Sequence, residues 1–197
     1  TRRSSDLNES SVVKIEAEAN DEWLIFDAGS GIRVLGQEIM KMGLTDQTFH
    51  LFLSHLHYDH IQGLPFFAPA YIHGNKIVFH GGHDDLETHL RSQMKRPFFP
   101  IDFDTFQADL SFEKHVPGEQ LKIADSEITF YKLNHPGDAY GFRVQQGEKS
   151  VVYSSDAEHP NIAHGHEYDY LDFIRGSNLL IFDAPYTHSQ SITTREH

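Results

Sequence analysis

The chain has 197 residues, 39% of them hydrophobic, so it can bury one substantial core and we expect a single domain over residues 1–197. Its formal net charge of −13 argues against long nucleic acids as partners, because these require broad basic surfaces. The absence of cysteine excludes disulfides and thiolate catalysis, and no apolar stretch of about 18 residues or signal-like start indicates a membrane span or export, so we expect a cytoplasmic protein without a membrane partner.

The N-terminal half alternates predicted strands with predicted helices. Apolar residues at every second position indicate a half-buried strand, and apolar residues at helical spacing indicate an amphipathic helix. The run FHLFL is rich in aromatic and aliphatic residues and too short for a helix, so it predicts a buried strand. These patterns predict strands at 13–17, 22–26, 49–53 and 75–80, and helices at 32–42 and 83–96.

The C-terminal half is richer in predicted strands. Strands are predicted at 110–114, 127–133, 140–145, 150–155 and 178–183, and a helix at 167–176. The strands between residues 110 and 155 follow one another as antiparallel strands do. We therefore expect an α/β sandwich in preference to a doubly wound parallel sheet.

The sequence SHLHYDH, which directly follows the strand predicted at 49–53, carries the densest set of metal-binding side chains in the chain. Within six residues come His55, His57, Asp59 and His60. In extended chain His55 and His57 project to the same side, while Asp59 and His60 can reach a neighbouring point once the chain turns. Imidazole and carboxylate ligands favour zinc, with manganese or iron as alternatives. The cluster predicts a site for two divalent ions.

Other predicted strands also end in polar residues, in the sequences FDAGS, LNHPG, SSDAEH and FDAPYT. Loops at strand ends are where folds carry their chemistry. We expect these ends to meet at one edge of the sandwich, where His135 and Asp156 would join the metal cluster.

Together, DAG, HLHYDH, the lone His135 and the lone Asp156 resemble the metallo-β-lactamase superfamily, and FDAGSGIR, LNHPG and SSDAEH are similar to its phosphodiesterase branch, which includes ribonuclease Z and cyclic phosphodiesterases. The resemblance implies an αββα sandwich of two mixed sheets flanked by helices. It implies that His55, His57 and His135 hold one metal, Asp59 and His60 the second, and Asp156 both. It also implies that Asp27 braces the metal loop, and it allows a homodimer.

The chain departs from the family in one respect. The family normally supplies a last histidine to the second metal from a downstream Gly-His-Ser motif, which this sequence does not contain. His188 and His197 are weak substitutes, so we expect that C-terminal elements of the sandwich are lacking from the given sequence.

The ligand set predicts a hydrolase in which two metal ions share a water, lower its pKa and deliver hydroxide to a small cyclic or nucleotide phosphodiester. Asp59 is the candidate for orienting the attacking water, and His159 is a candidate general acid. Phe98, Phe99 and the cations of the helix predicted at 83–96, Arg91 among them, are weaker candidates for substrate contacts. The alternatives are a lactone or thioester hydrolase and a non-catalytic metal-binding module.

Overall fold

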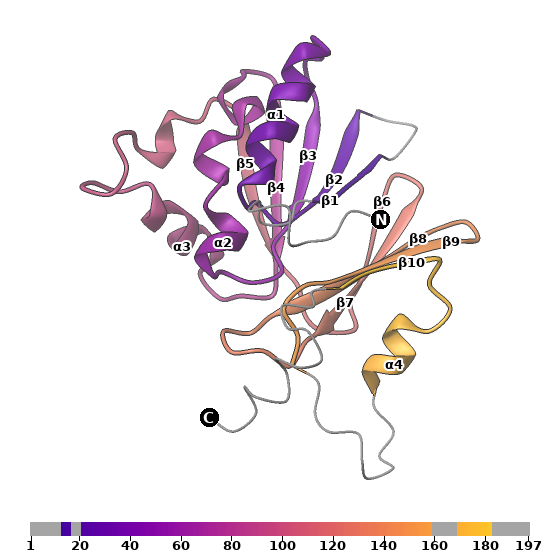
Figure 1. Cartoon of the computed structure of the whole chain (residues 1–197). Coiled ribbons are helices and arrows are strands. Elements are labelled where there is room, and N and C mark those ends of the chain that lie inside the picture. The colour runs from indigo at the N-terminus through magenta and orange to yellow at the C-terminus, as the bar shows by residue number, and fades with distance from the viewer. Residues whose placement is uncertain (1–12, 17–20, 159–168, 183–197) are drawn as a thin grey trace.

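The structure, a computed structural model, describes residues 13–16, 21–158 and 169–182 and contains two five-stranded sheets (Figure 1). In sheet A, β2 to β5 run parallel and β1 pairs antiparallel with β2. Its strands, in spatial order, are β1 (Val13–Glu16), β2 (Glu22–Phe26), β3 (Thr48–Phe52), β4 (Lys76–Gly81) and β5 (Asp109–Lys114).

Sheet B is mainly antiparallel. Strands β6 to β9 form an antiparallel meander, and β10 pairs parallel with β9. In spatial order its strands are β10 (Leu179–Phe182), β9 (Lys149–Ser154), β8 (Tyr140–Gln146), β7 (Ser126–Lys132) and β6 (Gln120–Ile123). Both sheets are therefore mixed, as expected.

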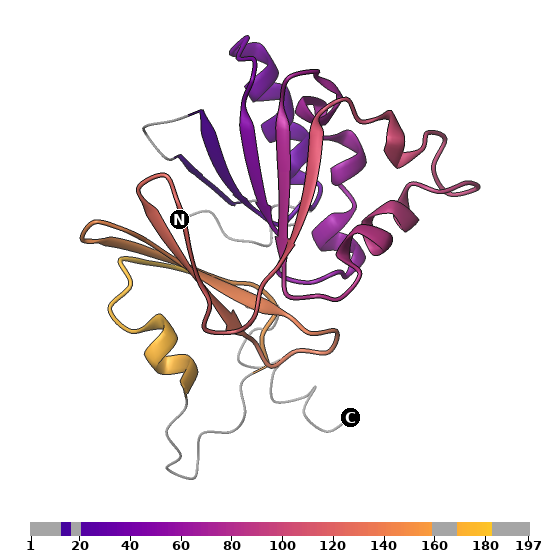
Figure 2. The same ribbon diagram turned by 180° about the vertical axis from the view of Figure 1, so that it is seen from behind.

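Helices cover the outer face of each sheet, as the view from behind in Figure 2 also shows. On sheet A lie α1 (Gly31–Lys41), α2 (Tyr58–Ile61) and α3 (Leu86–Gln93), and on sheet B lies α4 (Asp169–Ile174). Alternation along each strand sends side chains to both faces. In β3, Phe49 and Leu51 pack under the helices, whereas Phe52 packs between the sheets. On the far side Tyr170 and Phe173 of α4 pack on sheet B. The predicted αββα sandwich is confirmed.

Three local predictions need correction. The strand predicted at 110–114 is not part of the antiparallel series, because β5 pairs parallel with β4 in sheet A. Strand β6 was not predicted, since QLKI is short and half polar. Helix α3 begins at Leu86 and not at residue 83, because Asp85 adopts a left-handed conformation with φ 51° that a helix does not continue.

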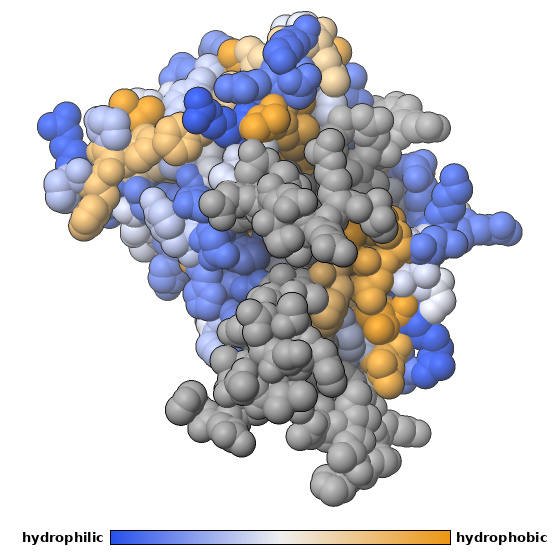
Figure 3. All heavy atoms as spheres, in the orientation of Figure 1, coloured by the Kyte–Doolittle hydropathy of each residue, from blue (hydrophilic) through white to orange (hydrophobic). Residues whose placement is uncertain are grey.

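Exposed apolar side chains lie at several places on the described part of the surface. In Figure 3 apolar side chains gather over β10 and α4, where Leu171, Leu179, Leu180 and Phe182 are exposed. Phe98, in the loop after α3, is 88% exposed. Among the described residues, no helix has the length and apolar character needed to cross a bilayer.

Candidate metal centre

The predicted metal loop begins where β3 leaves sheet A. The backbone N–H of Tyr140, at the start of β8, donates to the carbonyl of Ser54, which fixes this end of β3 against sheet B. His55 and His57 follow in extended chain, and α2 then turns Asp59 and His60 back toward them. The loops after β7 and β9 supply His135 and Asp156 from sheet B. Strand ends of both sheets therefore meet at one edge.

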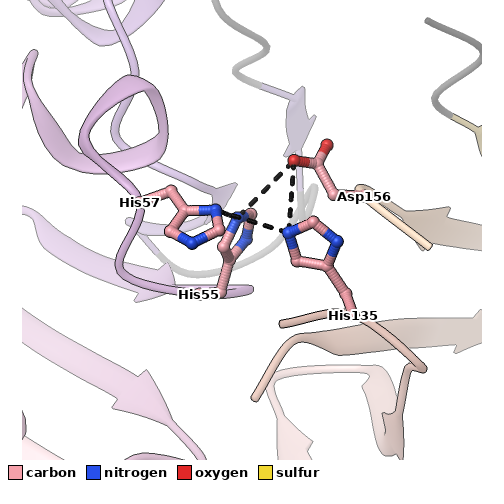
Figure 4. Close-up of side chains that lie close together, drawn as sticks. All are labelled: His55, His57, His135 and Asp156. Carbon is pink, nitrogen blue, oxygen red and sulfur yellow. Dashed lines mark hydrogen bonds and ion pairs between the residues drawn. The ribbon is translucent and has the colours of Figure 1, made fainter. Parts of the chain in front are cut away.

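Four side chains from three loops converge there (Figure 4). His57 Nδ1 lies 2.9 Å from His55 Nε2 and 3.3 Å from His135 Nε2. Asp156 Oδ2 lies 3.6 Å from His55 Nε2 and 3.8 Å from His135 Nε2. Ligand atoms about 2.0–2.1 Å from a tetrahedral zinc ion are about 3.3 Å apart. The spacing of these nitrogen and oxygen atoms therefore fits a cation.

A second half of the site shares Asp156. His60 Nε2 lies 3.5 Å from Asp156 Oδ2 and 3.4 Å from Asp59 Oδ2. His60 is buried, whereas the side chain of Asp59 is 60% exposed. One oxygen of Asp156 thus faces both groups of ligands, which is the arrangement that the family resemblance implies for two adjacent ions.

Asp27 is a fully buried carboxylate behind the metal loop. Its Oδ1 accepts from the backbone N–H of Ser54 at 2.7 Å. Its Oδ2 accepts from the Ser54 hydroxyl at 2.8 Å, from His60 Nδ1 at 2.8 Å and from the Tyr153 hydroxyl at 2.5 Å. Asp27 has a φ of 61°, which Asp and Asn tolerate better than most residues. This brings its carboxylate under both loop histidines.

These hydrogen bonds determine which ring nitrogen of each histidine is free. The Ser54 hydroxyl donates to Asp27, so it accepts from His55 Nδ1 at 3.1 Å. His60 donates through Nδ1 to Asp27 directly. In both rings Nε2 is therefore left to face the ion site, which is the usual way that outer hydrogen bonds orient metal-binding histidines.

The two imidazoles differ in protonation when no cation is present. Burial, and to a lesser extent the nearby His60, lower the pKa of His55 to about 4, so His55 is neutral at pH 7. Burial also lowers the pKa of His60, but interactions with Asp156 and Asp27 outweigh it and raise the pKa to about 10. A cation at His60 Nε2 competes with that proton.

Close backbone approaches hold the loop in place. A Cβ on Gly63 would lie 1.9 Å from the carbonyl oxygen of Gly29, so only glycine lets the end of the metal loop pack on the turn after β2. Gly137 has φ +89°, and a Cβ there would lie 3.3 Å from His57 Nε2. Gly63 thus allows a backbone approach that a side chain would block, and Gly137 allows a backbone conformation that L side chains rarely adopt.

Beside the metal loop is a cavity of about 460 Å³. The residues around it come from the metal loop, the loop after β4, the β5–β6 connection and the loop after β7. They include Leu56, His83, His115, Asp138 and Tyr140. His83 Nε2 donates to the carbonyl of Gly137 at 3.3 Å, which joins the wall of the cavity to the His135 loop.

Other candidate residues lie elsewhere. His159, His188 and His197 fall outside the described residues. Arg91 donates to Glu87 and Asp104 and lies over the ring of Phe103, so its contacts are those of a structural cation. Sequence reasoning missed Ser54 and Tyr153. Ser54 directly precedes HLHYDH, but nothing in the sequence indicates its role, and only the packing of β9 against β2, where the ring of Tyr153 lies 5.8 Å from that of Phe26, shows that Tyr153 reaches Asp27.

Comparison with known sequences assigns the family. The profile of the family described as "Beta-lactamase superfamily domain" matches residues 22–197. The chain belongs to this superfamily. The resemblance that HLHYDH predicts is thereby confirmed. A curated relative, Ribonuclease Z of Prochlorococcus marinus (strain MIT 9301), is 30% identical over 90% of this chain and 56% of its own length. The chain thus spans about half the length of this relative.

Solved structures of the superfamily share the fold. The metallo-β-lactamase fold protein YhfI of Bacillus subtilis aligns with a TM-score of 0.66 at 21% identity, over 92% of this chain and 66% of that one. The short form of human tRNase Z gives a TM-score of 0.67 at 19% identity, over 95% and 76%. By their names, the ribonuclease Z and tRNase Z neighbours act on RNA.

Proposed function

We propose that this chain is the metal-binding part of a phosphodiester hydrolase that uses two divalent cations, with zinc favoured and manganese or iron as alternatives. The observation that supports this most is the convergence of six ligand side chains from three loops on one edge of the sandwich. His55, His57 and His135 would hold one ion, Asp59 and His60 the second, and Asp156 both. The names of the relatives and the family assignment point to the same chemistry.

When bound, such ions polarise phosphoryl oxygens and lower the pKa of water. The chain's own residues prepare the site for this. Through their hydrogen bonds to the Nδ1 atoms, Asp27 and Ser54 aim His55 Nε2 and His60 Nε2 at the ligand cluster. Asp59, whose carboxylate is exposed beside His60, is placed to orient a water or pass a proton to a leaving group. We keep His159 as a candidate general acid on the sequence alone.

The cavity beside the metal loop is the candidate for receiving the rest of the substrate. Its wall includes the imidazoles of His83, His89 and His115, which suit an anionic or hydrogen-bonding ligand. It also includes the carboxylate of Asp138, which would repel a ligand group of high negative charge. Its volume of about 460 Å³ fits a nucleotide-sized group. This supports a cyclic or nucleotide diester, or one nucleotide of a longer RNA, as the group nearest the ions.

The test compares hydrolysis of bis(p-nitrophenyl) phosphate, a cyclic nucleotide, a structured RNA, a homoserine lactone and a glutathione thioester. We expect turnover of a phosphodiester that is lost on chelation and in His57→Ala but kept in His73→Ala, a control at an exposed histidine outside the proposed ligand set. The assay is made on the given chain and on a chain extended toward the length of the ribonuclease Z relative. Turnover of the lactone or thioester alone, or activity that survives in metal-stripped His57→Ala, would contradict the proposal.

A further inference from the structure

A second group of metal-binding side chains lies on the face of sheet A that meets sheet B. His80 lies in β4, Glu113 lies beside it in β5, and His115 follows β5. The side chains of His80 and His115 are buried, whereas that of Glu113 is 48% exposed. None of the three belongs to the HLHYDH loop or to the predicted ligand set.

The geometry of this group repeats that of the first site. His80 Nδ1 lies 2.9 Å from His115 Nε2, and Glu113 Oε2 lies 3.4 Å from the first nitrogen and 3.7 Å from the second. The corresponding distances from His55 Nε2 in the first site are 2.9 Å to His57 and 3.6 Å to Asp156. Two imidazoles and one carboxylate thus present three ligand atoms at spacings that match the first cluster.

Outer hydrogen bonds orient the imidazole of His115 as they orient His55 and His60. The carboxylate of Glu119 accepts from His115 Nδ1 at 2.8 Å and from the backbone N–H of Val116 at 3.0 Å. Since His115 Nδ1 carries the proton, its Nε2 lone pair faces His80 and Glu113. A histidine whose second nitrogen donates to a carboxylate is the usual form of a metal ligand.

His50 completes a row of three imidazoles and leaves one atom unpaired. His50 Nδ1 lies 2.9 Å from His80 Nε2, and His50 Nε2 is a buried nitrogen with no hydrogen-bond partner. The side chains of His50 and His80 are both buried, where a charged imidazole is costly and the neutral form is favoured. With no cation, the protons run from His50 to His80 to His115, and His50 Nε2 is an unpaired acceptor.

A bound cation would reverse the direction of hydrogen-bond donation between His50 and His80. If His80 Nδ1 binds an ion, its proton moves to Nε2, which then donates to His50 Nδ1. The proton of His50 moves to Nε2, where Glu22 Oε1 lies 4.0 Å away and becomes an acceptor within a small side-chain movement. The atom that lacks a partner in one arrangement gains one in the other.

We propose that His80, Glu113 and His115 form a further divalent-metal site of the zinc type, separate from the proposed catalytic centre. Binding requires the two nitrogens to part from 2.9 Å to about 3.3 Å, a change of a few tenths of an ångström. The exposed Glu113 gives the ion its entry from solvent and leaves a fourth position for water. The ion would join β4 to β5 and fix His115, which lines the cavity beside the metal loop.

The test removes the first site and asks what remains. In His57→Ala/Asp156→Ala, which removes a ligand of each ion of the proposed catalytic centre, we expect one equivalent of Co²⁺ to stay bound after dialysis, with a ligand-field spectrum of nitrogen and oxygen ligands. Adding Glu113→Gln should weaken this binding by about tenfold or more, because losing a direct ligand costs no less than losing an outer one. Glu127→Gln, an exposed glutamate on β7 with the same charge change, should leave it unaltered.

A second measurement covers the case in which the double variant does not fold. In the otherwise unaltered chain, Glu113→Gln is a surface change, and it should lower the zinc content by one ion relative to Glu127→Gln. Titration with Zn²⁺ should also shift the side-chain ¹⁵N signals of His80 and His115. Equal metal content in the two glutamine variants, or ¹⁵N signals of His80 and His115 that do not respond to Zn²⁺, would overturn the proposal and leave a hydrogen-bonded row of imidazoles.

Discussion

Replacing Asp27 by asparagine tests how the proposed metal centre is held together. Asparagine has nearly the same shape and tolerates the φ of 61° at this position, so the backbone can stay as it is. The change removes the negative charge and turns one oxygen into an NH₂ group. Three donors, from Ser54, His60 and Tyr153, point at Oδ2, and the backbone N–H of Ser54 points at Oδ1. Whichever way the amide turns, its NH₂ group faces a donor from which it cannot accept.

The magnitude follows from these contacts. Hydrogen bonds to a charged group are worth about 1.5–3 kcal/mol each, and leaving buried donors unpaired adds to their loss. Allowing for rearrangement, we expect Asp27→Asn to destabilise the metal-free protein by about 3–5 kcal/mol. Since His55 and His60 lose their common anchor, affinity for both ions of the proposed catalytic centre should fall about 10–100-fold.

The assay has two readouts. Urea unfolding in the presence of a chelator gives the free energy of unfolding, and competition with a chromophoric chelator gives metal affinity. The matched control is Asp21→Asn, an exposed aspartate that also has a left-handed φ, of 53°. If Asp27→Asn and Asp21→Asn show the same metal affinity, Asp27 does not orient the ligands, and the reasoning from its hydrogen bonds is wrong.

Three further predictions follow from buried groups. Burial holds the pKa of His50 at about 4 and that of His80 at about 2, so below about pH 6.5 the unfolded chain takes up protons on these rings before the folded chain does. In the presence of chelator the free energy of unfolding should therefore fall by roughly 3 kcal/mol for each ring between pH 6.5 and pH 4. Urea unfolding should show a weaker dependence of this free energy on pH in His50→Phe, and an unchanged dependence would contradict the neutral rings. Gly63→Ala should cost about 3 kcal/mol and weaken metal binding, because its Cβ would overlap the carbonyl of Gly29; a fully stable, metal-loaded variant in the same unfolding assay would disprove the tight packing. Tyr153→Phe should cost about 1–2 kcal/mol and reduce metal affinity less than Asp27→Asn; a larger effect on affinity would reverse the order of importance that the hydrogen bonds suggest.

The sequence was sufficient for most of the fold because local pattern and tertiary position agree. The apolar run before Ser54 is buried on both faces, as a central parallel strand must be, and it is too short to be a helix. The motif HLHYDH then located the site, since its ligand types are too dense to be explained by packing. His135 and Asp156 were predicted to join them, and the structure places both within 4 Å of the histidines; that they bind metal stays a prediction.

The parts that sequence could not give depend on contacts between distant segments. The partner of β5 is set by the crossover from β4 and not by its own residues, so LSFEK gives no sign that it belongs to sheet A. The row of His50, His80 and His115 is invisible in one dimension, because the three lie on or after neighbouring strands and are about 30 to 65 residues apart. Three histidines in apolar surroundings read individually as ordinary strand residues.

The division of the ligands between the sheets has a mechanical consequence. His55, His57, Asp59 and His60 follow a strand of sheet A, whereas His135 and Asp156 follow strands of sheet B. Neither sheet supplies all the proposed ligands, so the bound ions would cross-link one layer to the other. By linkage, whatever loosens the contact between the layers must weaken ion binding by the same free energy, and loading with metal must tighten that contact in return.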